Sequence, residues 1–259
     1  MILFLSFSIL ILLFVAGWFI AGKISNVSIV DAMWALSINI PVTLYLRVFE
    51  GETTRDMLLL IMSLAWSFRL GSHLVKRIYK EHPAEDKRYS NLRKKWGENA
   101  HRNFIIVFLI NALLVFLLSL PFYYSSQAIG TIVLLEWIGF AIFLIGLIGE
   151  SVADYQLKKF RLSNQKDNPN KLQVCKVGLW NYSRHPNYFF EAVIWLGIYL
   201  FCLASPGGVY TIHAPIIISF LLIKVTGIPP LERVLIENKG NAYRTYQQST
   251  NAFIPWFKK

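Results

Sequence analysis

The chain has 259 residues, of which 55% are hydrophobic and 16% charged, and its net charge is +11. A soluble domain usually carries about a quarter charged residues, so this composition excludes an ordinary soluble enzyme and favours a protein that lies mainly in lipid. The basic residues lie in loops between apolar segments, which favours anionic headgroups over nucleic acid as their partners.

Hydropathy predicts seven membrane-spanning helices, at residues 3–20, 28–48, 57–79, 104–123, 129–153, 188–204 and 213–229. The first segment is long enough to cross a bilayer and lacks the basic start of a signal peptide, so we expect it to be retained. No internal repeat or low-complexity linker divides the chain. We therefore predict an all-α, polytopic membrane protein, with one seven-helix bundle formed by residues 1–259.

The distribution of Lys and Arg predicts the orientation of this bundle. Nine basic residues lie between positions 76 and 102 and seven between 158 and 184, whereas the connections near 125–130 and 206–210 have none. Because cytoplasmic loops carry the excess of Lys and Arg, the N-terminus should lie outside and the C-terminus in the cytoplasm. The cysteines Cys175 and Cys202 have no metal-ligand spacing, so neither a disulfide nor a metal site is predicted.

Polar side chains gather at the predicted cytoplasmic ends of the spans. Glu150 and Asp154 are four residues apart at the end of the fifth span, so they share a helix face, and Lys158 and Arg161 follow. Two carboxylates beside cations suit a ribose or an amide together with phosphates. An ordinary charged helix end that reaches to the interface is the alternative.

A second polar group leads into the sixth span. Pro186 suits the first turn of a helix, which places Arg184 and His185 just before an N-terminus that attracts anions. Asn187 and Glu191 follow at helical spacing and present an amide and a carboxylate on one face. A plain interfacial anchor of Arg, His, Trp and Tyr is the alternative reading.

The stretch Asn-Tyr-Ser-Arg-His-Pro-Asn-Tyr-Phe-Phe-Glu at 181–191 resembles the cofactor-binding signature of the steroid 5-alpha-reductase superfamily. The likeness is strongest to its bacterial branch, the 3-oxo-5-alpha-steroid 4-dehydrogenase-like membrane reductases of the DUF1295 type, and the sterol delta-14 reductases carry a similar stretch. Residues 150–161 and 230–255 also resemble segments of this superfamily, in the expected order.

This resemblance implies a seven-helix bundle that binds NADPH in a cavity facing the cytoplasm, with residues 1–125 on the substrate side and 126–259 on the cofactor side. At matching positions the cofactor would be lined by Glu150, Asp154, Arg161, Asn187, Glu191 and Trp195. Arg184, His185 and Tyr188 match the sterol-reductase version of the motif, and Glu232, Arg233, Tyr243 and Arg244 match the C-terminal cofactor segment. Glu150 departs from the pattern, because the steroid reductases have an amide there.

The catalytic residues follow from the same resemblance. In the resembling reductases a carboxylic acid from the second span and a tyrosine from the third polarise the substrate carbonyl. Asp31 is the candidate acid, and in an apolar cavity its carboxyl would stay protonated and able to donate. Alignment on Arg69 places Trp66 at the tyrosine position, where an indole donates a hydrogen bond but no proton. A helix cap near the membrane surface is the other reading of Asp31.

These features predict an NADPH-dependent reduction of a carbon–carbon double bond in a steroid-like enone, of the 3-oxo-delta-4-steroid 5-alpha-reductase type. The substrate would be a hydrophobic molecule entering from the bilayer, and the protein would lie in a bacterial inner membrane with its active site facing the cytoplasm. One alternative is an S-adenosylmethionine-dependent methyltransferase of the isoprenylcysteine carboxyl methyltransferase kind, which shares the Arg-His-Pro-x-Tyr stretch. Another is a non-enzymatic transporter or lipid-binding scaffold.

Overall fold

The computed structural model describes residues 1–49, 51, 53–167 and 173–257. In these residues, seven helices or helix pairs are long and apolar enough to cross a membrane, and no strand is present. The prediction of an all-α, seven-span membrane protein is therefore confirmed, while the orientation of the termini stays a prediction. The chain forms two compact units: unit 1 is Met1–Leu134 with Cys202–Thr211, and unit 2 is Leu135–Phe201 with Ile212–Lys259.

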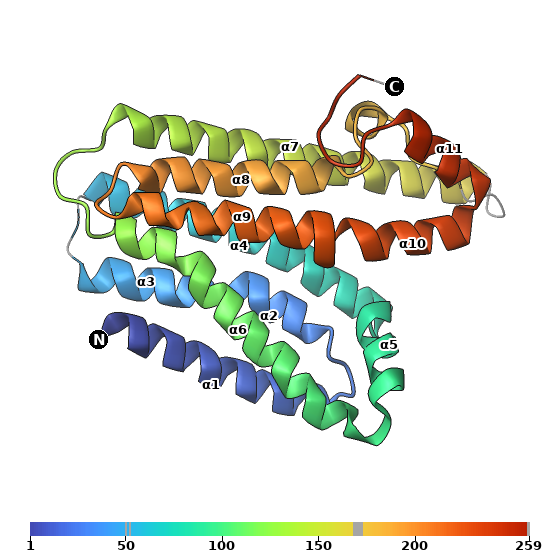
Figure 1. Ribbon diagram of the computed structural model, residues 1–259, viewed down its shortest axis with the longest axis horizontal. Coiled ribbons are helices and arrows are strands. Elements are labelled where there is room, and N and C mark those ends of the chain that lie inside the picture. The colour runs from blue at the N-terminus through green and yellow to red at the C-terminus, as the bar shows by residue number, and fades with distance from the viewer. Residues whose placement is uncertain (50, 52, 168–172, 258–259) are drawn as a thin grey trace. The chain divides into compact units, whose positions relative to one another are not determined.

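Unit 1 contains the first four spans (Figure 1). Its helices are α1 (Ile2–Lys23), α2 (Ile29–Ser37), α3 (Asn39–Val48), α4 (Thr53–Glu81), α5 (Lys87–Trp96) and α6 (Ala100–Ser125). Helix α1 packs along α6, and α2 packs along α4. The second span is interrupted at Ile38 because Pro41 has no N–H to donate to the carbonyl of Ser37.

Tyr45 joins three helices in the core of unit 1. Its side chain is fully buried, and its hydroxyl lies 3.1 Å from Ser6 Oγ on α1 and 3.2 Å from Ser119 Oγ on α6. Each serine hydroxyl also donates to a carbonyl of its own helix. Because apolar surface drives little association between helices in lipid, such buried hydrogen bonds help fix how α1, α3 and α6 pack.

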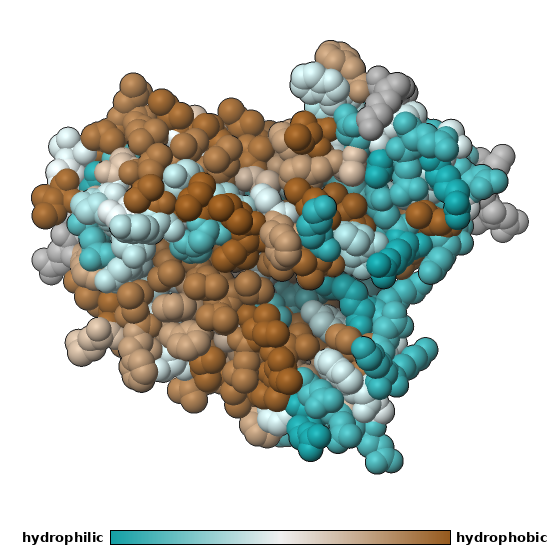
Figure 2. Space-filling model, viewed as in Figure 1, coloured by the Kyte–Doolittle hydropathy of each residue, from teal (hydrophilic) through white to brown (hydrophobic). Residues whose placement is uncertain are grey.

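Unit 2 contains the remaining spans and the C-terminal segment. Its helices are α7 (Leu134–Asp167), α8 (Pro186–Leu203), α9 (His213–Phe220), α10 (Ile228–Lys239) and α11 (Asn241–Ser249), and η4 (Leu221–Val225) is a π-helical turn between α9 and α10. Hydrophobic side chains cover α7 and α8, whereas hydrophilic ones gather around α11 and the end of α10 (Figure 2). Ile145 and Ile148 of α7 are 58% and 61% exposed, as expected of a lipid-facing surface.

Predicted boundaries of the fifth and seventh spans were wrong. The fifth span begins at Leu134, not 129, because residues 126–133 form a loop whose carbonyls at Ala128 and Gly130 accept hydrogen bonds from the buried Arg55. The seventh span does not end at Pro229. This proline lies in the first turn of α10, where its missing N–H costs nothing, and the helix continues to Lys239.

Helices α7 and α8 approach each other closely at glycines. A Cβ atom added to Gly139 would lie 2.3 Å from the backbone nitrogen of Phe201, and one added to Gly197 would lie 2.4 Å from that of Phe143. Small residues allow such close approach between membrane helices. The close contact brings the polar residues at the far ends of α7 and α8 within hydrogen-bonding reach.

Candidate functional site in unit 2

The entry to α8 is built on the surface of α7. Gly178 has φ +54°, a conformation that favours glycine, and a 3₁₀ turn, η2 (Gly178–Asn181), follows. Gln156 of α7 accepts a hydrogen bond from the backbone N–H of Leu179 (2.9 Å), and the indole of Trp180 donates to the carbonyl of Ala153 (2.9 Å). These contacts fix the loop that carries the Arg-His-Pro motif before Pro186 starts the helix.

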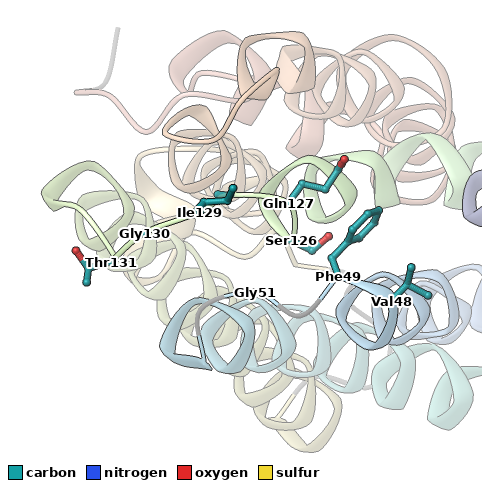
Figure 3. Close-up of a pocket in the computed structure, with 9 residues that line it drawn as sticks. Val48, Phe49, Gly51, Ser126, Gln127, Ile129, Gly130 and Thr131 are labelled. Carbon is teal, nitrogen blue, oxygen red and sulfur yellow. The ribbon is translucent and has the colours of Figure 1, made fainter.

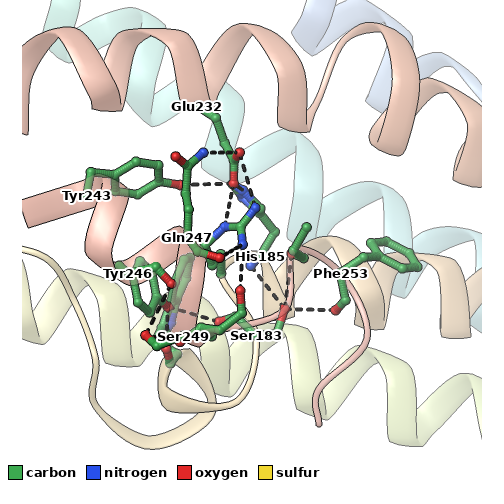
Figure 4. A network of polar contacts seen from close by, with 12 residues as sticks. Ser183, His185, Glu232, Tyr243, Tyr246, Gln247, Ser249 and Phe253 are labelled. Atoms are coloured by element: carbon green, nitrogen blue, oxygen red, sulfur yellow. Dashed lines mark hydrogen bonds and ion pairs between the residues drawn. The ribbon is translucent and has the colours of Figure 1, made fainter. Parts of the chain in front are cut away.

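Glu232 of α10 lies at the centre of a polar network, the Glu232 cluster, with Arg184, His185, Tyr243 and Gln247 (Figure 4). Its Oε1 accepts from Arg184 Nε (2.7 Å), His185 Nε2 (3.0 Å) and the Tyr243 hydroxyl (3.1 Å). Its Oε2 accepts from Gln247 Nε2 (2.7 Å) and Arg184 Nη2 (3.3 Å). Four residues from two segments, the loop before α8 and helix α11, therefore share one carboxylate.

Arg184 also holds the end of α11. Its Nη1 donates to the carbonyls of Gln247 (3.1 Å) and Thr250 (2.5 Å), which are among the last carbonyls of that helix and lack helical partners. Its backbone N–H donates to the carbonyl of Asn251 (2.9 Å). Four of the five guanidinium N–H groups thus donate inside the protein. A cofactor-binding role for Arg184 stays a prediction.

The C-terminal segment continues this attachment. Ser183 donates to the carbonyl of Phe253 (2.8 Å), and the backbone N–H of Trp256 donates to the carbonyl of Tyr182 (3.1 Å). The hydroxyl of Tyr246 donates to the carbonyl of Trp180. The motif at 181–191 and the tail at 230–255 each resemble a segment of that superfamily, and the structure joins the two by hydrogen bonds.

Burial sets the protonation of the cluster. His185 is 1% exposed, and this burial lowers its pKa, although the adjacent Glu232 carboxylate partly opposes the shift. Because a carboxylate only accepts, the neutral imidazole carries its proton on Nε2, which leaves a bare Nδ1. This Nδ1 is buried and has no hydrogen-bond partner among the described residues. Burial, and next the charge of Glu232, raise the pKa of Tyr243 well above its ordinary value, so its hydroxyl stays protonated.

The carboxylates of α7 and the amide of α8 face each other, as the sequence predicted. Asn187 Nδ2 donates to Asp154 Oδ1 (3.2 Å), and Trp195 Nε1 donates to Glu191 Oε1 (3.0 Å). Glu150 and Glu191 are each only 5% exposed. The amide oxygen of Asn187 is buried and accepts no hydrogen bond from the described residues. A buried acceptor without a donor is costly, so a ligand or water donor is expected there.

A small cavity of about 70 Å³ lies beside the Glu232 cluster and is lined by the cations Arg161, Arg184 and Lys239. Lys239 Nζ donates to the carbonyl of Gln173 (2.7 Å). Cys175 also lines the cavity, and burial raises the pKa of its thiol, which keeps it neutral. Arg161 and Lys239 therefore remain as cations for an anionic group.

Asp31 lies in unit 1, in surroundings that differ from those predicted. Its Oδ2 accepts from Arg88 (2.5 Å) and Arg77 (3.1 Å), and its Oδ1 accepts from the hydroxyl of Tyr89 (2.6 Å). The carboxyl group of Asp31 thus lies among two guanidinium groups and a hydroxyl, not in the apolar surroundings that were expected. The hydroxyl that can donate in this cluster belongs to Tyr89. A catalytic role for Asp31 stays a prediction.

The other predicted residues occupy varied positions. Trp66 is 1% exposed and meets Trp34 edge to face at 5.5 Å between ring centroids in unit 1. Tyr188 stacks on His185 at 5.4 Å. Arg233 and Arg244 are exposed on α10 and α11, outside the Glu232 cluster. The structure therefore gathers Arg184, His185, Glu232 and Tyr243 in one network and leaves Arg233 and Arg244 apart from it.

A wider pocket of about 770 Å³ lies in unit 1, between the loop after α3 and the loop after α6 (Figure 3). Phe49, Gln127 and Ile129 line it together with loop backbone, and the described residues around it include no titratable side chain. The described lining of this pocket lacks the groups that acid–base chemistry or anion binding requires, so we do not assign the site there.

Comparison with known proteins places this arrangement in a family. A family model described as "Protein of unknown function (DUF1295)" matches residues 17–250. The chain belongs to the DUF1295 family. This DUF1295 protein is also 26% identical to the uncharacterized protein C594.04c of Schizosaccharomyces pombe over 276 aligned residues, which cover 95% of the chain and 78% of that relative. No solved structure matches the chain.

Sequence reasoning missed two polar residues of this DUF1295 protein. Gln247 donates to Glu232, and the only sequence signal is its place four residues after Tyr243, on the same face of α11. Tyr89 lies in a segment that the sequence presented as a polar loop, and its partner Asp31 is 58 residues away. Long-range pairs of this kind leave no local pattern in a single sequence.

Proposed function

We propose that this protein is an NADPH-dependent reductase of a carbon–carbon double bond in a steroid-like enone, of the 3-oxo-delta-4-steroid 5-alpha-reductase type. The observation that carries the proposal is the contact between Asn187 and Asp154, which pairs two of the three segments that resemble that superfamily on one partly buried polar face. The family assignment supports it, since DUF1295 is associated with steroid 5-alpha-reductase-like proteins.

The residues of unit 2 fit a nicotinamide cofactor at several points. The free amide oxygen of Asn187 and the bare Nδ1 of His185 are buried acceptors, which suit the amide and hydroxyl donors of NADPH. Arg161 and Lys239 suit its phosphates, because both line the cationic cavity. At about 70 Å³ that cavity accommodates a phosphate-sized group, so we assign it to one part of the cofactor only.

Reduction of an enone needs hydride at the β-carbon and a donor at the carbonyl oxygen. When bound, NADPH supplies the hydride. In this chain we assign the donor to the Tyr89 hydroxyl. This hydroxyl donates to Asp31 Oδ1 at 2.6 Å, so the substrate carbonyl oxygen would replace Asp31 as its acceptor. Asp31 then acts as a carboxylate that positions Tyr89. Trp66 contributes apolar surface and an indole N–H.

The substrate class follows from the membrane setting. Seven apolar spans make this an integral membrane protein, and a flat hydrophobic enone, such as a 3-oxo-steroid, partitions into the same lipid. We propose that the reaction occurs at the cytoplasmic face, where the cationic loops are expected, and that the membrane is a bacterial inner membrane. Both statements extend the positive-inside reasoning from the sequence.

The first experiment titrates the detergent-purified protein with NADPH and, separately, with S-adenosylmethionine. We expect saturable binding of NADPH, and a loss of at least tenfold in affinity for Asn187→Leu, because a buried hydrogen bond to the cofactor disappears. Asn111→Leu is the matched control, since Asn111 donates only to the carbonyl of Val107 within α6. Binding of S-adenosylmethionine alone would favour the methyltransferase, and binding of neither would favour a non-enzymatic protein.

A second experiment tests the donor. Tyr89→Phe should retain NADPH affinity while the rate of NADPH oxidation with a 3-oxo-delta-4-steroid falls by about 10²–10⁴-fold, the usual contribution of a positioned acid. Tyr79→Phe is the control, because Tyr79 is 84% exposed on α4. An unchanged rate in Tyr89→Phe would remove Tyr89 from the mechanism and leave the cofactor assignment intact.

A further inference from the structure

Helix α5 has two charged faces with different partners. Its inward face is satisfied within unit 1: Arg88 pairs with Asp31, and Arg93 pairs with Glu85 at 2.8 Å. Its outward face carries Lys87, Lys94 and Lys95. We call these three exposed lysines the α5 lysine face. Lys94 and Lys95 follow Lys87 by seven and eight residues, about two helical turns, so all three lie on one side of the helix.

No carboxylate neutralises the α5 lysine face in the described part of the chain. The acids that cap and flank the helix, Asp86 and Glu85, are held by Arg88 and Arg93. Burial alone would raise the pKa of Asp86, but its hydrogen bonds and charge contacts with Arg88 lower it, so it stays an anion directed inward. Glu81 and Glu98 are the exposed acids nearby, and neither is in an ion pair within 4.0 Å among the described residues.

The position of α5 places this face at a membrane surface. Figure 1 shows α5 running across the direction of its neighbours α4 and α6, so it lies in the plane of the membrane when they span it. Trp96 at its end packs on Phe104 at 5.1 Å, and Trp18 on α1 donates to the carbonyl of His101 (2.8 Å) near the start of α6. Tryptophans are enriched at the level of the headgroups.

We propose that the α5 lysine face binds the headgroups of anionic phospholipids, and that this contact holds α5 against unit 1. Lysines at this depth contact lipid phosphates directly. Each lysine near the surface of an anionic membrane increases the affinity for that membrane about fivefold. The partner is a lipid layer, because the face lies beside spans and continues the cations Lys23 and Arg102 at the ends of α1 and α6. Bound headgroups would oppose displacement of α5. Arg88 and Tyr89 on the inner face of this helix are hydrogen-bonded to Asp31.

The test is hydrogen exchange of the full chain in nanodiscs of phosphatidylcholine with or without phosphatidylglycerol. We expect amides 87–96 to exchange at least fivefold more slowly with phosphatidylglycerol. The variant Lys87→Gln/Lys94→Gln/Lys95→Gln should lose this difference, and the corresponding triple arginine variant should keep it. Lys158→Gln/Lys159→Gln, at exposed lysines of unit 2, should also keep it.

Three results would overturn the proposal. The first is equal protection of α5 in both lipids, and the second is a lipid-dependent difference that survives in the triple glutamine variant. The third is full protection of α5 by soluble glycerophosphate in pure phosphatidylcholine, which would make the face a general anion site. None of these readouts depends on NADPH or on turnover, so they remain separate from the proposed reductase activity.

Discussion

The carboxylate of Glu232 compensates a nearly buried arginine, because the side chain of Arg184 is only 10% exposed. Glu232→Ala would leave that guanidinium without its counter-ion, which typically costs about 3 kcal/mol or more. We expect the apparent unfolding midpoint in detergent to fall by roughly 6–12 °C. Glu237→Ala, an exposed position one turn later on α10, should change it little. Equal midpoints for the two variants would contradict the role assigned to Glu232.

His185 makes stability depend on pH in a defined direction. Burial lowers its pKa in the folded protein below 6.5, so the unfolded chain binds the proton more readily. Its contribution to stability is therefore complete above pH 6.5 and is lost as the pH falls from 6.5 through the lower folded pKa. The unfolding midpoint of the wild type should be lower at pH 5.5 than at pH 7.5. The difference between the two pH values should be smaller in His185→Gln. An identical decrease in both proteins would show that other groups cause it.

Local sequence patterns indicated some of the polar contacts in the structure and gave no sign of others, for a physical reason. Asp154 and Asn187 were recognised because each lies on a polar helix face beside apolar turns, and the fold brings them to 3.2 Å. Arg184 was predicted to bind an anion because it precedes a helix N-terminus. In the structure Arg184 pairs with the carboxylate of Glu232, which lies 48 residues later in the sequence. No residue near Arg184 in the sequence indicates this pairing.

At the scale of elements, the contact between α7 and α8 depends on glycine. A methyl group at Gly197 would lie 2.4 Å from the backbone nitrogen and 2.7 Å from the Cα of Phe143, and backbone atoms cannot rotate away. Gly197→Ala should therefore separate the helices and cost at least 1–3 kcal/mol, about 2–12 °C in the unfolding midpoint. It should also weaken the contact between Asn187 and Asp154, and under the function we propose this would lower the affinity for NADPH.

Gly17→Ala is the informative comparison. Its added methyl would come closest to the flexible end of Met33, at 2.3 Å from Cε and 2.4 Å from the sulfur, and would lie 3.3 Å from Cε1 of Phe108. Methionine adapts readily, and alanine is favoured over glycine in a helix by about 1 kcal/mol, so the two effects should nearly cancel. If Gly17→Ala destabilised the protein as much as Gly197→Ala, the backbone contact would not explain the result.

Hydropathy predicted the membrane-spanning helices, because contact with lipid is enough to determine their structure. All seven spans were found, because an apolar segment long enough for the bilayer has few alternatives to a helix. Helix α5 was missed: Lys87–Trp96 contains five basic residues in ten, and its inward face depends on Asp31 and Glu85 from elsewhere in unit 1. The same limit explains why α7 runs to Asp167, well beyond the apolar part that predicted an end at 153.

At the scale of the whole molecule, each unit combines a lipid-facing apolar surface with one enclosed polar cluster. Unit 1 satisfies Asp31 with cations from α4 and α5, and unit 2 satisfies Glu232 with the entry of α8 and the C-terminal segment. Buried charges in membrane proteins are paired in this way because an isolated charge in lipid is costly.

The clustering of cations in particular loops makes the orientation of the chain testable. The predicted cytoplasmic loops carry the excess of Lys and Arg, so Lys95→Cys on α5 should be protected from a membrane-impermeant maleimide in intact cells. Val209→Cys, at a position 56% exposed in the connection between α8 and α9, should be labelled. The native Cys175 and Cys202 are buried and give little background. Permeabilised cells should label both variants. The opposite labelling pattern in intact cells would show that the orientation is the reverse of the predicted one. The Glu232 cluster would then lie at the outer face, without access to cytoplasmic NADPH, which would contradict the proposed function.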